Sequence, residues 1–339
     1  MPNGPNIWAL VLAAGDGKRL ERLTTAHGGL AIPKQYCSLL RGPSLLHDAL
    51  RRAFAVTTHQ RTSVVVAEKH RCWWEPELSF LPADNVIVQP ENRGTGIGIL
   101  LPLLHILERD AGARIVILPS DHHVRVEAHL VRSLRAALET IRLQGEKTLL
   151  LGVRPEEADP GLGYIVPGAA HDEAALPVLQ FIEKPATADA MKLIERGALW
   201  NTFIIVADIR GLLRLYEHRI PEVVTEMRRA VRRDHEAAGA GRAVAELYAR
   251  LPPVDFSHDI LPAEESDIRV VPVRPCGWSD LGTPERLARA LARMPTKEMP
   301  SRIRTRHLEP RLSPLSLAEQ HARQATALLH PDRAIRRSY

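Results

Sequence analysis

A glycine-rich segment near the amino terminus combines residues that suit phosphate binding. Gly15, Gly17 and Arg19 follow the apolar stretch Ile7–Ala13, which predicts a buried strand. Glycine has no Cβ, so the backbone N–H groups of such a loop can approach an anion closely. Arg19 can add charge-assisted hydrogen bonds to phosphate oxygens. The spacing G-x-G-x-R lacks the third glycine of a dinucleotide-binding fingerprint, and an ordinary turn between a strand and a helix is the alternative.

A second segment places a carboxylate where a metal ion would be useful. Asp121 lies in Pro119-Ser120-Asp121-His122-His123, directly after the expected strand Ala113–Leu118. Ligands bind at the carboxyl ends of strands in open α/β sheets. Mg²⁺ prefers one or two carboxylates together with water and substrate phosphates, so Asp121 suits that ion. The two histidines do not favour zinc, because adjacent side chains of a strand point to opposite sides.

The elements that must position these residues alternate between strand and helix. We expect strands at Ile7–Ala13, Ser63–Ala67, Asn85–Gln89, Ala113–Leu118 and Thr148–Val153, and helices at Pro43–Val56, Gly96–Arg109 and Glu127–Leu143. This order predicts an α/β fold with a mixed, mostly parallel sheet and helices on both of its faces.

The second half of the chain departs from that rhythm. Strands are expected at Gly161–Val166, Val178–Glu183, Trp200–Val206 and Ile268–Val273, and helical patterns at Ala186–Arg196, Ile209–Arg250 and Pro284–Met294. Prolines 300, 310 and 314 then separate an Arg-rich tail with one helix candidate, Ser316–Leu329. We therefore predict one domain over residues 1–295, with halves at about 1–150 and 151–295, and a small, basic helical tail over 296–339.

The charge distribution argues against a nucleic-acid partner. The chain has a formal net charge of +5, and residues 301–339 alone hold eight arginines against three acidic residues. Residues 1–300 therefore balance at 37 basic and 37 acidic side chains. A nucleic-acid role is confined to the tail at most, and a solvated tail is the simpler interpretation.

Cysteine usage and hydropathy point to a reducing compartment. Cys37, Cys72 and Cys276 are odd in number and far apart, which favours free thiols over disulfides or zinc. No stretch approaches the roughly 18 apolar residues that a membrane helix needs. The amino terminus lacks the pattern of a signal peptide, so a cytoplasmic protein without a membrane partner is expected.

Eight segments, taken together, resemble the sugar-phosphate nucleotidyltransferase superfamily over residues 7–293, and most of all its mannose-1-phosphate guanylyltransferases. The segments are Gly15–Leu20, Pro33-Lys34-Gln35-Tyr36, Gln89–Gly96, Pro119–His123, Gly161–Ile165, Phe181–Pro185, Trp200-Asn201 and Gly277–Thr283. The resemblance implies a Rossmann-like sheet of the GT-A type. It also implies transfer of a nucleoside monophosphate from a nucleoside triphosphate, GTP first, to a sugar 1-phosphate, mannose 1-phosphate first, with release of pyrophosphate.

The resemblance also implies roles for individual residues. The catalytic set is Arg19, Lys34, Asp121, Lys184 and Asp280, with Asp121 and Asp280 holding Mg²⁺. Nucleotide-binding residues are Ala13, Ala14, Gly15, Gly17, Lys18, Gln89, Asn92, Gly94 and Thr95. Sugar-phosphate-binding residues are Gly163, Tyr164, Glu183, Lys184 and Asn201, and Asp255 is a structural residue or an indirect sugar contact. Only seven lysines stand against 38 arginines, and three of the seven, at 18, 34 and 184, lie within these segments.

Some positions depart from the guanylyltransferase pattern. Ala14 replaces the usual glycine, Lys18 the common threonine, and Asn201 is followed by Thr202-Phe203 where Ser/Thr-Gly is usual. The base and sugar therefore stay open, with CTP- or UTP-dependent transfer, as in methylerythritol-phosphate cytidylyltransferases, and a non-catalytic sugar-nucleotide sensor as alternatives. Helix capping is a further alternative for Asn92, Thr95 and Asp280. The oligomeric state is open too, a homodimer included.

Overall fold

The computed structural model describes residues 6–17, 20–25, 31–40, 42–169, 175–236, 241–261 and 268–293. Its strands are β1 (Ile7–Ala13), β2 (Thr62–Ala67), β3 (Val86–Gln89), β4 (Arg114–Pro119), β5 (His123–Val124), β6 (Thr148–Val153), β7 (Gly163–Pro167), β8 (Leu176–Glu183), β9 (Leu199–Asp208), β10 (Ile268–Val273) and β11 (Trp278–Ser279). Its helices are α1 (Glu21–Thr24), α2 (Leu45–Phe54), α3 (Arg71–Leu78), α4 (Gly94–Arg109), α5 (Glu127–Gln144), α6 (Thr187–Glu195), α7 (Ile209–Arg219), α8 (Pro221–Glu236), α9 (Arg242–Tyr248) and α10 (Pro284–Ala292).

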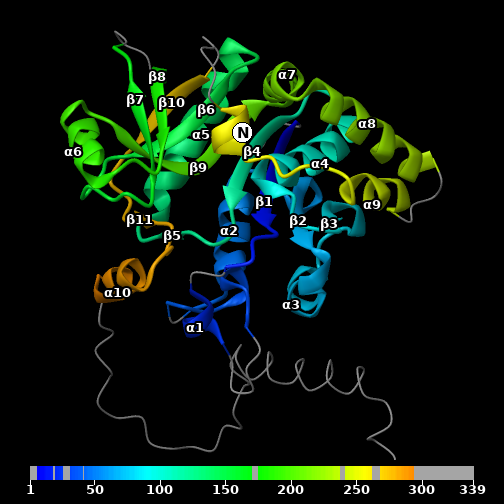
Figure 1. The fold of residues 1–339 in the computed structure, drawn as a ribbon, viewed down its shortest axis with the longest axis horizontal. Helices are drawn as coiled ribbons and strands as arrows, with labels where there is room; N and C mark the ends of the chain where they lie inside the picture. Colours follow the sequence, from blue (N-terminus) through cyan, green and yellow to red (C-terminus); the bar gives the residue numbers. More distant parts are fainter. Residues whose placement is uncertain are drawn as a thin grey trace, which may run out of the picture.

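Nine of these strands form one mixed sheet in the order β3-β2-β1-β4-β9-β6-β10-β8-β7, with a further pairing between β9 and β7 (Figure 1). Strands β1 to β4 pair only in parallel with one another, as the β-α alternation of the first half predicts. Strand β9 lies antiparallel between β4 and β6, and β7 and β8 are antiparallel neighbours. The fold is therefore mixed α/β. The expectation of a mostly parallel sheet is wrong, because the pairings that involve β7, β8 and β9 are all antiparallel.

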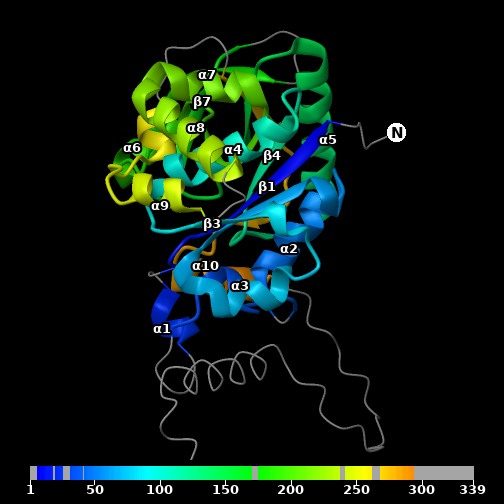
Figure 2. The same cartoon turned by 90° about the vertical axis from the view of Figure 1, so that its right-hand side faces the viewer.

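Helices cover both faces of the sheet (Figure 2). Alternate residues of β1 show the division, since Ala9 and Val11 join the core that includes side chains of α2, α3 and α5. Trp8 and Leu10 join the opposite core, with side chains of α4, α7, α8 and α9. Both strand faces are buried, so β1 reads as a continuous apolar run and not as an alternating one.

The expected helical stretch Ile209–Arg250 is three helices and not one. Helix α7 ends at Arg219 and α8 begins at Pro221, where proline lacks the N–H that a continuing helix would need. Helix α9 follows after residues outside the described part. In the described residues no helix is long and apolar enough to cross a membrane. The predicted tail, 296–339 with its helix candidate, lies outside the described residues.

A short two-stranded pairing determines where the two acidic segments meet. Strand β5 pairs antiparallel with β11, which sets Ser279 opposite His123. The backbone N–H groups of Arg125 and Val126 also donate to the Cys276 carbonyl. Asp121 and Asp280 flank these paired residues, so the chain brings together two segments that are more than 150 positions apart in sequence.

Candidate active site

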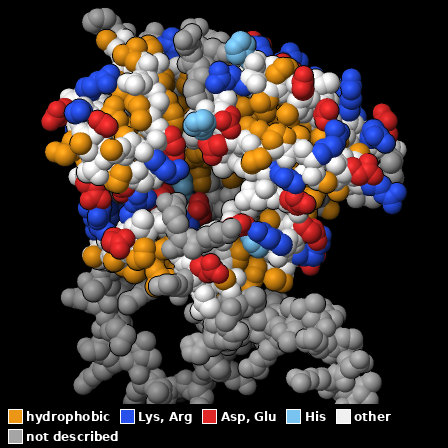
Figure 3. All heavy atoms as spheres, in the orientation of Figure 1, with side chains coloured by type: hydrophobic (Ala, Val, Ile, Leu, Met, Phe, Trp, Pro, Cys, Tyr) orange, Lys and Arg blue, Asp and Glu red, His pale blue; other side chains and the backbone are white. Residues whose placement is uncertain are grey.

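A pocket of about 370 Å³ opens where the first half of the sheet meets the second. Figure 3 shows the molecule hollowed near the centre of this face, with acidic side chains inside the hollow. Of the site residues predicted from the sequence, those that line the pocket are Ala14, Gly15, Gly17, Gln89, Asn92, Gly94, Thr95, Asp121, Gly163, Glu183, Lys184, Asn201 and Asp280. Segments from both halves of the chain therefore share one cavity.

Lys34 is buried behind the lining of this pocket and connects the two acidic segments. Its Nζ lies 2.9 Å from Oδ2 of Asp121 and donates to the backbone carbonyl of Asp280 at 2.6 Å. The Lys34 side chain is only 6% exposed, while the Asp121 side chain keeps 37% of its surface. A buried ammonium needs such partners, because burying an unpaired charge is costly. Lys34 thus holds the end of β4 against the segment that follows β11.

The glycine loop after β1 rests on the same Pro-Lys-Gln-Tyr segment. Gln35 Nε2 donates to the carbonyls of Ala13 and Gly15, at 3.0 and 2.9 Å. The hydroxyl of Tyr36 donates to the Ala13 carbonyl at 3.0 Å. Gly17 has a φ of 66°, and a Cβ there would lie 2.9 Å from the backbone nitrogen of Lys34. Only glycine fits this left-handed, crowded position without strain.

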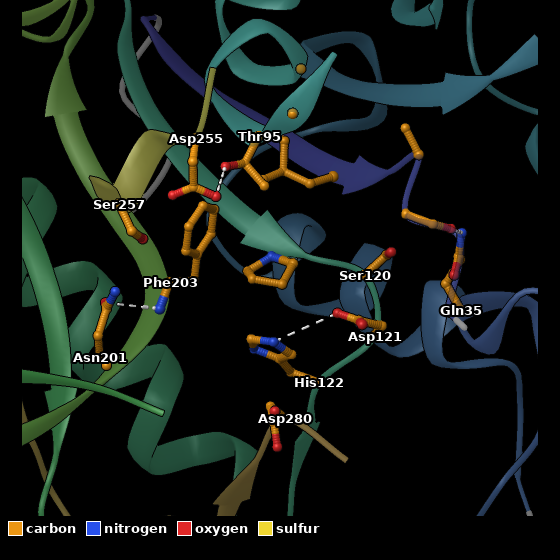
Figure 4. Close-up of a pocket in the computed structure, with 18 of the residues that line it drawn as sticks. Gln35, Thr95, Ser120, Asp121, His122, Asn201, Phe203, Asp255, Ser257 and Asp280 are labelled. Carbon is orange, nitrogen blue, oxygen red and sulfur yellow. Dashed lines mark hydrogen bonds and ion pairs between the residues drawn. The ribbon is translucent and has the colours of Figure 1, made fainter. Parts of the chain in front are cut away.

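The opposite side of the pocket holds the predicted sugar-phosphate residues. Lys184 Nζ lies 2.9 Å from Oε1 of Glu183, and the Lys184 backbone is left-handed with a φ of 48°. A Cβ on Gly163 would lie 2.6 Å from Oε2 of Glu183, so Gly163 and Glu183 are in direct contact. Asn201 Oδ1 accepts from the N–H of Phe203 at 3.0 Å, which fixes the Asn201 amide beside the cavity (Figure 4).

The start of α4 and the segment at Val254–Ser257 close a third side. Thr95 Oγ1 donates to Oδ2 of Asp255 at 3.2 Å and accepts from the N–H of Phe256 at 2.8 Å (Figure 4). Asn92 Oδ1 accepts from the N–H of Gly94 at 3.0 Å. Thr95 therefore joins α4 to a distant segment as well as starting the helix, and Asp255 lines the pocket itself.

A family comparison agrees with this assembly. The sequence pattern that defines the family described as "Nucleotidyl transferase" matches residues 8–297, which is most of the chain. The chain belongs to this nucleotidyl transferase family. The match begins in β1 and extends beyond α10, so it includes every segment that lines the pocket.

Individual proteins and one solved structure are also similar to this chain. A mannose-1-phosphate guanylyltransferase of Sinorhizobium fredii is 26% identical over 289 residues, which cover 82% of this chain and 54% of that protein. The xanthan biosynthesis protein XanB of Xanthomonas campestris is 26% identical over 281 residues, 82% of this chain and 58% of that protein. The chain spans about half the length of these curated relatives. A crystal structure from Thermus thermophilus, described as a mannose-1-phosphate geranyltransferase, aligns with a TM-score of 0.72 at 26% identity, covering 86% of this chain and 80% of that one.

Three residues predicted for the nucleotidyl transferase site, Lys34, Ala13 and Tyr164, do not line the pocket, and two more lie outside the described part of the chain. The side chain of Ala13 is fully buried in the core behind the loop. The ring of Tyr164 is fully buried too, and its hydroxyl donates to the Asp159 carbonyl at 3.0 Å, away from the cavity. Lys18 and Arg19 are the two outside the described residues.

Several pocket residues were not singled out in the sequence. Gln35, Ser120 and His122 line the cavity beside residues that were, and Phe203 and Ser257 complete the wall near Asn201 and Asp255. Gln35, Ser120 and His122 lie within motifs that the sequence analysis quoted, so the sequence could have indicated them. His123, in contrast, lies on the rear side of β5, among the residues of a second and smaller cavity. The two histidines thus line different cavities, although His122 precedes β5 and is not itself in a strand.

The charges around Asp121 keep its carboxylate ionised. Burial by itself raises the pKa of this carboxyl, but the attraction of Lys34 and His122 and the hydrogen bond from Lys34 outweigh it and leave the pKa below its ordinary value. Burial, aided by the positive charge of Lys34 and opposed by Asp121, lowers the pKa of His122. The site at neutral pH therefore presents an anionic Asp121 beside a neutral imidazole.

The donor chemistry of the pocket fits a magnesium ion that arrives with its substrate. Asp121 and Asp280 both line the cavity, and no group of three or more His, Cys, Asp or Glu among the described residues forms a closed metal cage. Mg²⁺ usually binds to one or two carboxylates and takes its other ligands from water and phosphates. Asp280 already accepts from Arg286 on both oxygens and from the N–H of Gly282 on one. A carboxylate has about four acceptor positions, so Asp280 retains room for a single further contact.

Proposed function

We propose that this chain transfers a nucleoside monophosphate from a nucleoside triphosphate to a sugar 1-phosphate and releases pyrophosphate. GTP and mannose 1-phosphate are the first substrates to test, because the curated relatives carry the name mannose-1-phosphate guanylyltransferase. The proposal concerns the activity of the chain itself, since the chain spans about half the length of those relatives.

One observation carries the proposal: Lys34 pairs with Asp121 while it donates to the carbonyl of Asp280. This contact places a buried cation between Asp121 and the backbone of Asp280, and both of these aspartates line the pocket. The pocket is also lined by a second cation, Lys184, which pairs with Glu183. Two anionic substrates need such a site, with positive charge on both sides of the reacting phosphates.

The reaction requires no protein nucleophile. An oxygen of the sugar phosphate attacks the α-phosphorus in line, a new P–O bond forms, and the bond to the β-phosphate oxygen breaks as pyrophosphate leaves. In this proposal the glycine loop after β1 binds the triphosphate through backbone N–H groups, and Lys34 neutralises charge beside it. Lys184 binds the sugar phosphate. Glu183 accepts hydrogen bonds from the sugar hydroxyls, and the Asn201 amide donates hydrogen bonds to them. Positioning and neutralisation provide most of the rate enhancement in such transfers.

Asp121 and Asp280 would hold Mg²⁺ in this scheme. The ion, when bound, would reduce the repulsion between the two phosphate groups. Asp121 suits this role best, because its carboxylate is anionic and partly exposed to the cavity.

The two substrates divide the chain in this proposal. Residues up to about 150 form the nucleotide-binding half and residues 151–295 the sugar-phosphate half of a Rossmann-like, GT-A-type sheet. The parallel strands β1 to β4 support the first assignment, because phosphate loops follow the first strand of such sheets. The antiparallel insertion of β7, β8 and β9 supports the second, since it carries Gly163, Glu183 and Asn201 to one side.

A non-catalytic sugar-nucleotide sensor is the second candidate. The observation in its favour is that Arg286 already bonds both oxygens of Asp280. A sensor would bind the nucleotide sugar without needing a metal at that carboxylate.

A substrate grid tests both candidates. Each of the four nucleoside triphosphates is combined with a panel of sugar 1-phosphates, and pyrophosphate release is measured with and without Mg²⁺. We expect release for GTP with mannose 1-phosphate, only with the metal present. Release with CTP or UTP alone would change the base in the proposal. If every combination is silent but GDP-mannose still binds by calorimetry, the sensor is the correct function.

A further inference from the structure

The side chain of Arg286 on α10 lies between two carboxylates from distant parts of the chain. Its Nη1 donates to both oxygens of Asp280, each at 2.7 Å. On its other side, Nε and Nη2 donate to Asp159 at 2.8 and 2.6 Å. Arg286 and both carboxylates are nearly buried, with 8%, 12% and 13% of their side-chain surfaces exposed. No motif predicted this residue, which does not itself line the main pocket.

Asp159 passes this connection to the loop that precedes β7. Its Oδ1 accepts from the N–H of Gly161 at 2.8 Å, and its backbone exchanges hydrogen bonds with the buried hydroxyl of Tyr164. Gly161, Leu162 and Gly163 line the pocket on its sugar side. The position of this loop therefore depends on where Arg286 holds Asp159.

The loop in turn fixes the predicted phosphate cation of the sugar half. The carbonyl of Leu162 accepts from the backbone N–H of Lys184 at 3.2 Å, and Lys184 has the left-handed φ of 48°. A lysine is strained in this region and persists there only where its surroundings hold it. A continuous series of contacts thus runs from Asp280 through Arg286, Asp159 and the loop to Lys184.

Close packing leaves Arg286 little freedom to move. A Cβ on Gly161 would lie 2.6 Å from Nη2, and one on Gly282 would lie 2.9 Å from Nη1. Both carboxylates also accept backbone N–H bonds, from Gly161 and Gly282, in addition to those from the guanidinium. The planar guanidinium can bond two carboxylates along two edges at once, which an ammonium cannot do.

We propose that Arg286 is a positioning residue that sets Asp280 and Lys184 in register on the two sides of the reacting phosphates. This inference rests on the proposed function. It identifies the residue that keeps Asp280 and Lys184 in fixed positions relative to each other across the pocket. Arg286 touches neither substrate in this scheme. It acts through Asp159 on the sugar side and through Asp280 on the metal side.

Arg289 on the same helix and Arg293 directly after it provide matched controls. Arg289 pairs with Glu157, and Arg293 pairs with Glu156. These pairs have the same chemistry and join the same upstream segment, but their side chains are 39–49% exposed. Exposed pairs contribute little, so they should not transmit position to the site.

The test compares Arg286→Lys, Asp159→Asn, the double variant and Arg289→Lys. For Arg286→Lys we expect the KM for the sugar 1-phosphate to rise about tenfold or more, with the KM for the triphosphate within about twofold. Asp159→Asn keeps its shape and the Arg286–Asp280 bonds, and should also raise the sugar 1-phosphate KM, although Asp159 does not line the pocket. The double variant should be no worse than the more severe single variant, because both changes break one series of contacts. Arg289→Lys should match the wild type.

Calorimetry gives a reading that does not depend on turnover. Titrations with GDP and with GDP-mannose, or the pair that the substrate grid identifies, measure how much the sugar adds to affinity. We expect Arg286→Lys and Asp159→Asn to lose most of that gain while GDP binds as before. Independent, multiplicative effects of the two changes, or an equal loss of triphosphate affinity, would overturn the role of Arg286. A wild type that is silent in the grid would instead remove the proposed function, and the two failures are therefore distinct.

Discussion

The two halves of the pocket place left-handed backbone in different residues. In the first half, Gly17 and Gly94 take positive φ values of 66° and 82°. In the second half, the left-handed residues that line the pocket are Lys184 and Phe203, at 48° and 57°. Glycine adopts this region freely, whereas other residues are held there at a cost of about 1–3 kcal/mol each.

This difference indicates two kinds of recognition. On the proposed nucleotide side, Gly17 and Gly94 let other backbone segments approach closely, so we expect shape and backbone N–H groups to determine binding there. On the sugar side, the strain is retained together with a particular side chain, such as the ammonium of Lys184 or the ring of Phe203 in the pocket wall. Backbone strain of this kind is concentrated at functional sites. Changes of side chain should therefore act mainly on the sugar side, and changes of glycine mainly on the nucleotide side.

The largest effect is expected at the junction of the two sides. Asp121→Asn should lower kcat by about 10³-fold with the fold intact, because it removes an anion that the metal and Lys34 both need. Turnover at saturating substrates and a thermal unfolding curve measure this. Asp280→Asn should lower kcat as well, but it also leaves Arg286 with a weaker buried partner, so its melting temperature should fall further. Near-normal turnover in both variants would refute the metal assignment.

Lys184→Ala tests the sugar side alone. The variant keeps a non-glycine residue at a φ of 48° and removes only the cation, so strain is unchanged. We expect kcat/KM for the sugar 1-phosphate to fall about 10²-fold and triphosphate binding to stay the same. Lys192→Ala, at an exposed lysine on α6, is the control and should have the same kcat/KM as the wild type. A matching loss for the triphosphate would show that the two sides are not separate.

Sequence patterns predicted the local elements of the first half well. The strands Ile7–Ala13 and Thr148–Val153 have the predicted bounds, as does Ile268–Val273 in the second half. Long apolar runs with β-branched residues, bounded by turn residues, carry enough local signal for this. Ala14, Gly15 and Gly17 of the glycine loop also meet Asp121 in one pocket, because the carboxyl ends of β1 and β4 are neighbours in the sheet.

The sugar side was less predictable because its arrangement depends on distant pairings. Tyr164 was expected to meet the sugar, yet its ring is buried and its hydroxyl holds Asp159. Arg286 was unremarkable as one arginine of a helix, and its partner Asp159 lies 127 positions upstream. Nor does a sequence alone reveal that Phe203 takes a left-handed conformation, since an aromatic residue in an expected strand predicts the opposite.

Two glycines of the first loop provide a comparison within the proposed nucleotide side, because an alanine would be crowded at Gly17 and not at Gly15. Gly17→Ala should raise the KM for the triphosphate about tenfold and lower stability, because its Cβ would press on the backbone nitrogen of Lys34 at a positive φ. Gly15→Ala meets nothing within 4 Å, so the fold should be unchanged. If phosphates bind along the loop, the methyl group of Gly15→Ala should still weaken triphosphate binding. Calorimetric titration with GTP and thermal unfolding separate these outcomes, and unaltered GTP binding in both variants would move the triphosphate elsewhere.

The smallest effect concerns a carboxyl group behind the nucleotide side. Ser44 caps α2 by accepting from the His47 N–H, and its hydroxyl donates to Oε2 of Glu77 at 2.6 Å. Burial raises the pKa of Glu77 to about 7, from 4.5, although the bond from Ser44 opposes the shift. As the pH rises from about 4.5 to 7, the unfolded chain loses this proton before the folded one does, so the free energy of unfolding falls over that window and stays lower above it.

Glu77→Gln keeps an oxygen that can accept from Ser44 but cannot ionise. It should therefore stabilise the protein by about 2 kcal/mol at pH 8 and leave stability unchanged near pH 4.5. Urea unfolding at the two pH values measures the difference, and Glu75→Gln on the exposed face of α3 is the control. Equal stability of Glu77→Gln and the wild type at pH 8 would mean that the Glu77 carboxylate is solvated or paired when ionised. Turnover of Glu77→Gln should equal that of the wild type, because Glu77 supports α2 and not the pocket. If the triphosphate KM changes with pH in the wild type but not in Glu77→Gln, ionisation of Glu77 also affects the Lys34 segment.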